Sequence, residues 1–169
     1  MEQTVTSSTT KGIVISLVMI VIGLIGFFLN IDTTGYFKYI NFIILIGGII
    51  WSVSFYGKQV NYNSTFGNYF AHGFKVAAII TVIMIIYVAI VLNVFPEMKE
   101  RGLDAARKSM EQKGKMTEDQ ITQAMSVTQK FFMVFAIGGL LVGNLIFGAI
   151  ASVIGAGVTK KNPHPFVEG

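Results

Sequence analysis

The chain has 169 residues, of which 53% are hydrophobic and 13% are charged, and its mean hydropathy is +0.64. Soluble domains carry a charge on about a quarter of their residues, so this composition excludes an ordinary soluble protein. The net charge of +4 comes from 13 basic and 9 acidic residues dispersed along the chain, which argues against nucleic-acid binding. The absence of cysteine excludes disulfides, thiolate metal sites and cysteine nucleophiles.

Four stretches contain no Asp, Glu, Lys, Arg or His: residues 12–31, 39–56, 76–95 and 131–158. A helix rises about 1.5 Å per residue and the hydrocarbon layer is about 30 Å thick, so about 20 apolar residues cross it. The sequence therefore predicts an all-α membrane protein with four transmembrane helices in antiparallel hairpins. The membrane domain is predicted over 12–158, with spans at 12–31, 39–56, 74–95 and 131–158.

The first span follows a polar, Ser/Thr-rich segment, residues 1–11, which we expect to be a disordered tail. The apolar region of this span exceeds the roughly 7–15 residues of a signal peptide, so we expect it to be retained. A tight turn over 32–35 then leads into the second span. Aromatic rings prefer the membrane interface, where we place those that follow this turn. They are Tyr36, Phe37 and Tyr39.

A helical turn is predicted to lead into the third span. Ser64 or Thr65 is suited to cap it, because a side-chain oxygen satisfies a free backbone N–H. The aromatic residues that follow have the spacing of one helical face. They are Phe66, Tyr69, Phe70 and Phe74. Pro96 ends or kinks the third span.

Tyr69, His72 and Lys75 are candidate interfacial residues. His72 is either an interfacial ring, which we favour, or a proton-transfer group or head-group ligand. His164 lies in a proline-rich segment, residues 159–169, which we expect to be a flexible tail. Two isolated histidines without cysteine predict no metal site, and no cofactor is expected.

The long loop, residues 97–130, carries seven basic and six acidic residues. A helix is predicted over 97–112, and Gly114 breaks it. Thr117 opens a capping box with Gln120, and the apolar spacing from Ile121 continues into the fourth span. The sequence predicts one helix of about 40 residues from Ile121, packed against 97–112 in an extramembrane helical hairpin.

Small residues recur along the fourth span, and one strongly polar side chain lies near its middle. Such a face predicts close packing against a neighbouring helix. The candidate helix-packing residues are Asn144, Gly148, Ser152, Gly139 and Gly143. Alternatively, Asn144 contacts a substrate in a cavity shared with Tyr87.

No catalytic site is predicted. Ion-coupled transporters and membrane enzymes need ionisable groups within the spans, and the four stretches contain none. We therefore expect a non-enzymatic scaffold or accessory subunit of an envelope system. The alternative is an oligomeric small-molecule or lipid transporter, and a third class is a membrane enzyme or a subunit that completes one. A polar cavity around Asn144 would favour transport, whereas a dry bundle with a projecting hairpin would favour scaffolding.

The expected partners are the lipid bilayer and either a second copy or another membrane protein, with no nucleic acid. Four spans place both termini on one side. A count of Lys and Arg, 5 on that side against 8 on the other, would make the long loop cytoplasmic. We nevertheless expect cytoplasmic termini, because the short segments on that side carry lysines close to the span ends.

Several features resemble a known family: Tyr62, the Ser-Thr-Phe-Gly step at 64–67, Phe70 and Gly73, then Pro96 with a charged loop, and a Gly-rich last span ending in Lys160 and Lys161. They are similar to the four-helix membrane proteins, common in Bacteroidota, known as domain of unknown function 4199. The resemblance covers nearly the whole chain. It implies a bacterial inner (cytoplasmic) membrane location, and no activity or functional residue comes with it.

Overall fold

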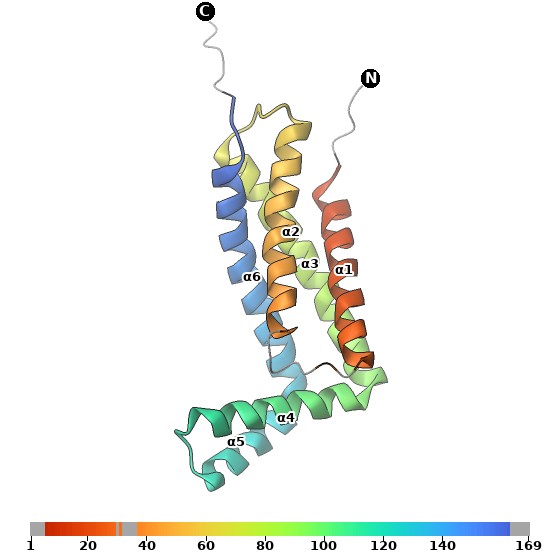
Figure 1. Ribbon diagram of the computed structural model, residues 1–169, viewed down its shortest axis with the longest axis vertical. Helices are drawn as coiled ribbons and strands as arrows, with labels where there is room; N and C mark the ends of the chain where they lie inside the picture. Colours follow the sequence, from red (N-terminus) through yellow and green to blue (C-terminus); the bar gives the residue numbers. More distant parts are fainter. Residues whose placement is uncertain (1–5, 30, 32–36, 163–169) are drawn as a thin grey trace, which may run out of the picture.

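Figure 1 shows the computed structural model, which describes residues 6–29, 31 and 37–162. The described residues form no strand. Their helices are α1 (Ser8–Phe28), α2 (Phe37–Gln59), α3 (Phe66–Val94), α4 (Pro96–Lys113), α5 (Glu118–Lys130) and α6 (Phe132–Val158). Four of them, α1, α2, α3 and α6, are long and apolar enough to cross a membrane, and they run side by side in one bundle. The predicted fold class is confirmed.

The start of α1 and the end of α6 lie at the same end of the bundle, called here the termini end (Figure 1). The opposite end, called the hairpin end, carries α4 and α5. At the termini end the loop between α2 and α3 contacts the segment after α6, because Asn162 donates to the carbonyls of Tyr62 and Asn61. Residues 159–162, predicted as part of a flexible tail, are thus held in place.

Two helices begin earlier than their predicted spans. Ser7 caps α1 by accepting a hydrogen bond from the Thr10 backbone N–H, so residues 8–11 are helical rather than disordered. Thr65 caps α3 in the same way, through Asn68 N–H, and the predicted helical turn is continuous with the span. The predicted turn at 32–35, Tyr36 and the His164 segment lie outside the described residues, and so does the side chain of Phe37.

The core lies between α2, α3 and α6. It includes Leu45, Ile49 and Val53 of α2, Val76, Ala77 and Ile80 of α3, and Ala151 of α6, each at most 1% exposed. Large apolar side chains also cover the outer faces of the four long helices, among them Ile43, Ile86 and Val134. Apolar residues both inside and outside are what a bundle surrounded by lipid requires.

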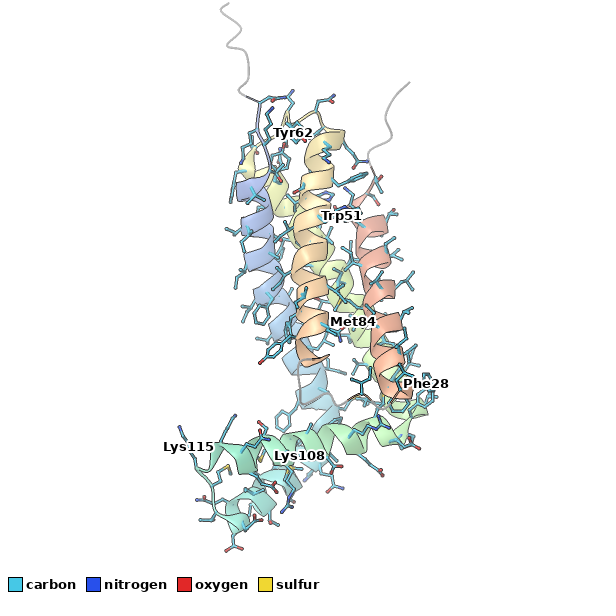
Figure 2. All side chains as sticks on the ribbon, in the orientation of Figure 1. Phe28, Trp51, Tyr62, Met84, Lys108 and Lys115 are labelled. Atoms are coloured by element: carbon cyan, nitrogen blue, oxygen red, sulfur yellow. The ribbon has the colours of Figure 1, made fainter. Side chains whose placement is uncertain are left out.

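The α4–α5 hairpin lies across the hairpin end of the bundle rather than projecting from it (Figure 1). Thr117 forms the predicted capping box with Gln120 at the start of α5. Arg107 of α4 joins the two helices, with contacts of 2.7 Å to the carboxylate of Glu111 and 3.1 Å to that of Glu118. Lys108 and Lys115, labelled in Figure 2, lie on this hairpin.

The single helix of about 40 residues predicted from Ile121 is interrupted at Phe131, where φ is −108° and ψ is 20°. Backbone hydrogen bonds continue across this residue, so the interruption is a bend rather than a loop. The next residue, Phe132, packs on Gly102 of α4, where an added Cβ would lie 2.6 Å from Phe132 Cζ. Contact between this ring and α4 accompanies the bend, and no periodicity in the sequence shows it.

Candidate functional site

Polar side chains gather inside the bundle at two places. The first, near the termini end, is the Lys11–His72 cluster, which consists of Ser8, Lys11, Ser52, Tyr56, Gln59 and His72. Lys11 is only 2% exposed and His72 only 7%. Because α1, α2 and α3 each contribute residues, the cluster joins three helices.

Every polar atom at the centre of this cluster has a partner. Lys11 Nζ donates to Gln59 Oε1 at 3.1 Å and to the Ser52 carbonyl at 3.4 Å, and it lies 3.5 Å from His72 Nε2. His72 Nε2 also lies 3.2 Å from Ser52 Oγ, and its Nδ1 lies 3.0 Å from Ser8 Oγ. If Nε2 accepts from Lys11, the ring is neutral and Nδ1–H donates to Ser8.

Aromatic rings complete the surroundings of the cluster. Tyr56 stacks on the imidazole of His72, with ring centroids 4.3 Å apart and planes 6° apart. Lys11 Nζ lies 5.0 Å from the ring centroid of Phe55 and 5.7 Å from that of Tyr56, within cation–π range. No carboxylate pairs with Lys11 in the described chain. Neutral acceptors and ring faces stabilise its ammonium group, so the arrangement suits a structural clasp between helices.

The three candidate interfacial residues lie in different surroundings. His72 and Tyr69 point into the bundle, and Tyr69 is fully buried, whereas Lys75 is exposed. The hydroxyl of Tyr69 is buried without a hydrogen-bond partner in the structure. How deep these residues lie in the bilayer stays a prediction.

The second place, called here the hairpin-side cavity, consists of two separate pockets in the hairpin half of the bundle that share Asn41 in their walls. These pockets are called the outer and the inner compartment. The outer compartment, of about 360 Å³, lies between α1, α2, α3 and α4, and Tyr87 and Arg101 are in its wall. The inner compartment, of about 340 Å³, lies between α1, α2, α3 and α6, and Asn144 and Met84 (labelled in Figure 2) line it. Asn41 of α2 lines both compartments.

Polar groups in this cavity lack partners. The Oδ1 atom of Asn41 is buried and accepts no hydrogen bond in the structure. Asn144 is 9% exposed, and neither its amide nor the hydroxyl of Tyr87 forms a hydrogen bond within the described chain. Buried polar groups are nearly always hydrogen-bonded in proteins, so groups without a protein partner beside a cavity mark a candidate site for water or a ligand.

The cavity separates the five candidate packing residues into two groups. Gly148 and Ser152 contact α3, because a Cβ at Gly148 would lie 2.5 Å from Ala77 Cβ, and Ser152 Oγ lies beside Gly73. An added Cβ at Gly139 or Gly143 would meet no atom within 4 Å, and both residues line the inner compartment with Asn144. Within this chain α6 leaves space at Gly139 and Gly143 rather than touching a neighbouring helix, and packing there against another chain stays a prediction.

Sequence reasoning missed Lys11 and Asn41. Lys11, Ile15 and Met19 follow one another at steps of four and share the buried face of α1, but the other faces of α1 are apolar as well, so the sequence does not single out this face. Asn41 is an amide inside the uncharged stretch 39–56, the same signal that singled out Asn144. Among the described residues, no three His, Cys, Asp or Glu side chains are placed to hold a metal ion.

Residues 10–161 match the family model described as "Protein of unknown function (DUF4199)". The chain belongs to this family. Neither curated proteins nor solved structures give a match. The DUF4199 match contains the whole hairpin-side cavity and all of the Lys11–His72 cluster except Ser8, so both sites lie within the family's domain.

Proposed function

We propose that this protein binds a small amphipathic molecule or lipid inside its four-helix bundle, in the inner membrane of a bacterium. The observation that supports this most directly is the hairpin-side cavity with its unpartnered Asn41 and Asn144. Each compartment has a volume within the roughly 300–1,000 Å³ typical of ligand sites. A polar cavity around Asn144 is the feature that the sequence reasoning names in favour of the small-molecule or lipid transporter over the dry scaffold.

The lining suits binding without ion coupling. The inner compartment combines apolar side chains such as Met19, Leu45 and Met84 with two amides, and no ionisable side chain is among its described lining residues. Apolar walls bind a hydrocarbon portion, and a few polar groups fix the orientation of a ligand. Proton or ion pathways need ionisable groups, and the described lining of this compartment has none, so the compartment is suited to lipid handling rather than to ion coupling.

Filling the inner compartment tests the proposal. Gly143→Leu puts a side chain into the compartment, whereas Gly157→Leu, in the same helix, adds the same volume outside this compartment, where no atom lies within 4 Å. Lipids that co-purify with each protein from native membranes would be quantified by mass spectrometry against a detergent-only control. We expect one amphiphile class to be retained by wild type and Gly157→Leu and to fall at least about tenfold in Gly143→Leu, about 1.4 kcal/mol. Equal retention by all three proteins would contradict the proposal.

A second candidate function, the scaffold or accessory subunit, rests on the α4–α5 hairpin. No residue of α4 is buried, and Ile121 is the buried residue of α5. Apolar Met116 and Val127 are exposed on the hairpin, a surface that a second copy or another membrane protein would cover. A photo-crosslinker at Val127 in native membranes should give one defined adduct that is absent when it is placed at Lys160. A smear at both positions would argue against a specific partner.

Cytoplasmic termini are part of the proposal. At the termini end, the described basic residues have no acidic residue among them, whereas seven basic and six acidic residues share the hairpin region. Anionic lipids of the cytoplasmic leaflet attract lysines that no acidic residue opposes, which favours the first end in the cytoplasm against the bare count of Lys and Arg. The residues in question are Lys11, Lys58, Lys75, Lys160 and Lys161. Impermeant labelling of Thr9→Cys, Glu111→Cys and Lys160→Cys in intact cells should modify only Glu111→Cys, and the reverse pattern would invert the orientation.

A further inference from the structure

Building on the proposed function, we infer that the inner compartment binds an uncharged lipid head that carries hydroxyl groups, held between the amides of Asn41 and Asn144. Both amides line this compartment, and they come from α2 and α6. The bundle supplies neither of them with a hydrogen bond within the described chain. A ligand head placed between them would have polar groups on two sides.

The amide of Asn144, which lines the compartment without a hydrogen bond inside the described chain, offers an acceptor as well as a donor, whereas Asn41 Oδ1 has almost no accessible surface. An amide oxygen pairs only with an O–H or N–H group, so an ester or ether oxygen alone cannot satisfy that of Asn144. A hydroxyl both donates and accepts, so it pairs with a side-chain amide in either orientation of the amide. Two hydroxyls on adjacent carbons, as in a glycerol head, provide one for each amide.

The uncharged lining of the compartment selects against ionic heads. Among the described residues, its lining includes no Asp, Glu, Lys, Arg or His. A carboxylate, phosphate or ammonium placed there would lose its hydration without gaining a counter-charge. Arg101 lines the outer compartment instead, where its Nη1 lies 3.3 Å from the Phe27 carbonyl and its guanidinium lies 4.7 Å from the Phe27 ring centroid.

The glycines of α6 set the size of the head. Gly139 and Gly143 leave room beside Asn144, and the compartment of about 340 Å³ lies at the small end of ligand sites. It therefore fits a compact head and the first part of a chain, with Met19, Leu45 and Met84 as the apolar wall. A bulky sugar head exceeds this space.

Three photoreactive probes with the same chain and the same diazirine position separate the possibilities: a monoacylglycerol, the free fatty acid and its methyl ester. Each is offered to the purified full-length protein in nanodiscs, and labelled peptides are mapped by mass spectrometry. We expect the monoacylglycerol to label peptides containing Met84 or Leu140 at least about five times more than the other two, about 1 kcal/mol. Unlabelled monoacylglycerol should compete.

Variants tie this preference to the two amides. Asn41→Leu and Asn144→Leu should each lower monoacylglycerol labelling to the level of the methyl ester. Asn93→Leu is the matched control, because Asn93 is an exposed amide of α3 that donates to its own helix at Ala89 O. Asn41→Ser, which supplies a hydroxyl in place of the amide, should recover part of the labelling that Asn41→Leu loses. A thermal unfolding curve for each variant shows that the variant is folded.

The outcomes distinguish the inference from the proposed function. Equal or stronger labelling by the fatty acid or the methyl ester would overturn the uncharged hydroxyl head but leave lipid binding in place. If no probe gives labelling of the cavity that unlabelled lipid reduces, only water occupies the cavity. The inference and the proposed function then both fail. Labelling that persists in Asn41→Leu and Asn144→Leu would overturn the role assigned to the amides.

Discussion

The Lys11–His72 cluster and the hairpin-side cavity are both polar, but they differ in whether the fold satisfies them. In the cluster, Lys11 Nζ and both ring nitrogens of His72 have protein partners within 3.5 Å. In the cavity, Asn41 and Asn144 have none within the described chain. A satisfied buried group stabilises a fold, whereas an unsatisfied one beside open space is what a ligand site has before its ligand arrives. The charged cluster therefore suits a structural role, and the neutral cavity is the site that we propose for a ligand.

Helix packing explains where each region forms. Near the termini end the helices touch, since a Cβ at Gly12 would lie 2.7 Å from Ile79 Cγ2 and one at Gly155 would lie 3.1 Å from Val53 Cβ. Toward the hairpin end α6 leaves space beside Gly139 and Gly143. Substitutions in the two halves should therefore have opposite consequences.

The largest effect is expected from Gly148→Leu, in the packed half. An added Cβ already meets Ala77 Cβ at 2.5 Å, so leucine forces α6 away from α3 at a cost of about 3 kcal/mol or more. The monodisperse fraction in size-exclusion chromatography should fall sharply. Ile150→Leu, at an exposed position of the same helix, should leave it unchanged. Similar yields from both variants would mean that the α3–α6 contact is not close.

Lys11→Met should have the next largest effect. It removes the donor shared by Gln59 and the Ser52 carbonyl, and unpaired buried acceptors cost about 1–3 kcal/mol. The midpoint of thermal unfolding should fall, whereas Lys75→Met, at an exposed lysine, should change stability by less than about 0.5 kcal/mol. A rise in the midpoint for Lys11→Met would show that the buried ammonium group destabilises the fold rather than holding the helices together.

Asn144→Leu should behave in the opposite way when no ligand is present. The amide forms no hydrogen bond within the described chain, and leucine places apolar atoms beside Met19 and Met84, so stability should stay within about 1 kcal/mol of wild type or rise. Thermal unfolding of delipidated protein provides the measurement. A loss as large as that of Lys11→Met would remove the distinction between the two regions.

Arg107→Ala should have the smallest effect. Arg107 links α4 to Glu118 of α5, but the side chains of all three residues in this network are largely exposed. Exposed ion pairs contribute little and are screened by salt. Amide exchange across α4 and α5 should rise slightly, and less so at high salt, while the midpoint for the bundle stays constant. A lower midpoint would mean that the hairpin supports the four spans.

The sequence predicts the four spans and the capped starts of α3 and α5, because hydrophobic length and N-cap chemistry are local properties. The burial of Lys11 is harder to predict from the sequence, since it depends on Gln59 and His72, which belong to other helices. The cavity is harder still to predict. Gly139 and Gly143 repeat at a step of four, as Asn144 and Gly148 do. Only the distance between α6 and its neighbours shows which of these positions are in contact and which leave space. The bend at Phe131 likewise depends on a ring that meets α4.

The contact between α3 and α6 also has a consequence for biogenesis. Membrane proteins are made from the N-terminus, so α3 is complete before α6 has been translated. Until then Gly73 and Ala77 face an empty side of the nascent bundle, because Ser152 and Gly148 are their partners. The first three helices therefore form an incomplete assembly in the lipid. The core is complete only when the last helix has left the ribosome. A chain that stops before α6 leaves this groove open to the quality-control proteases of the membrane.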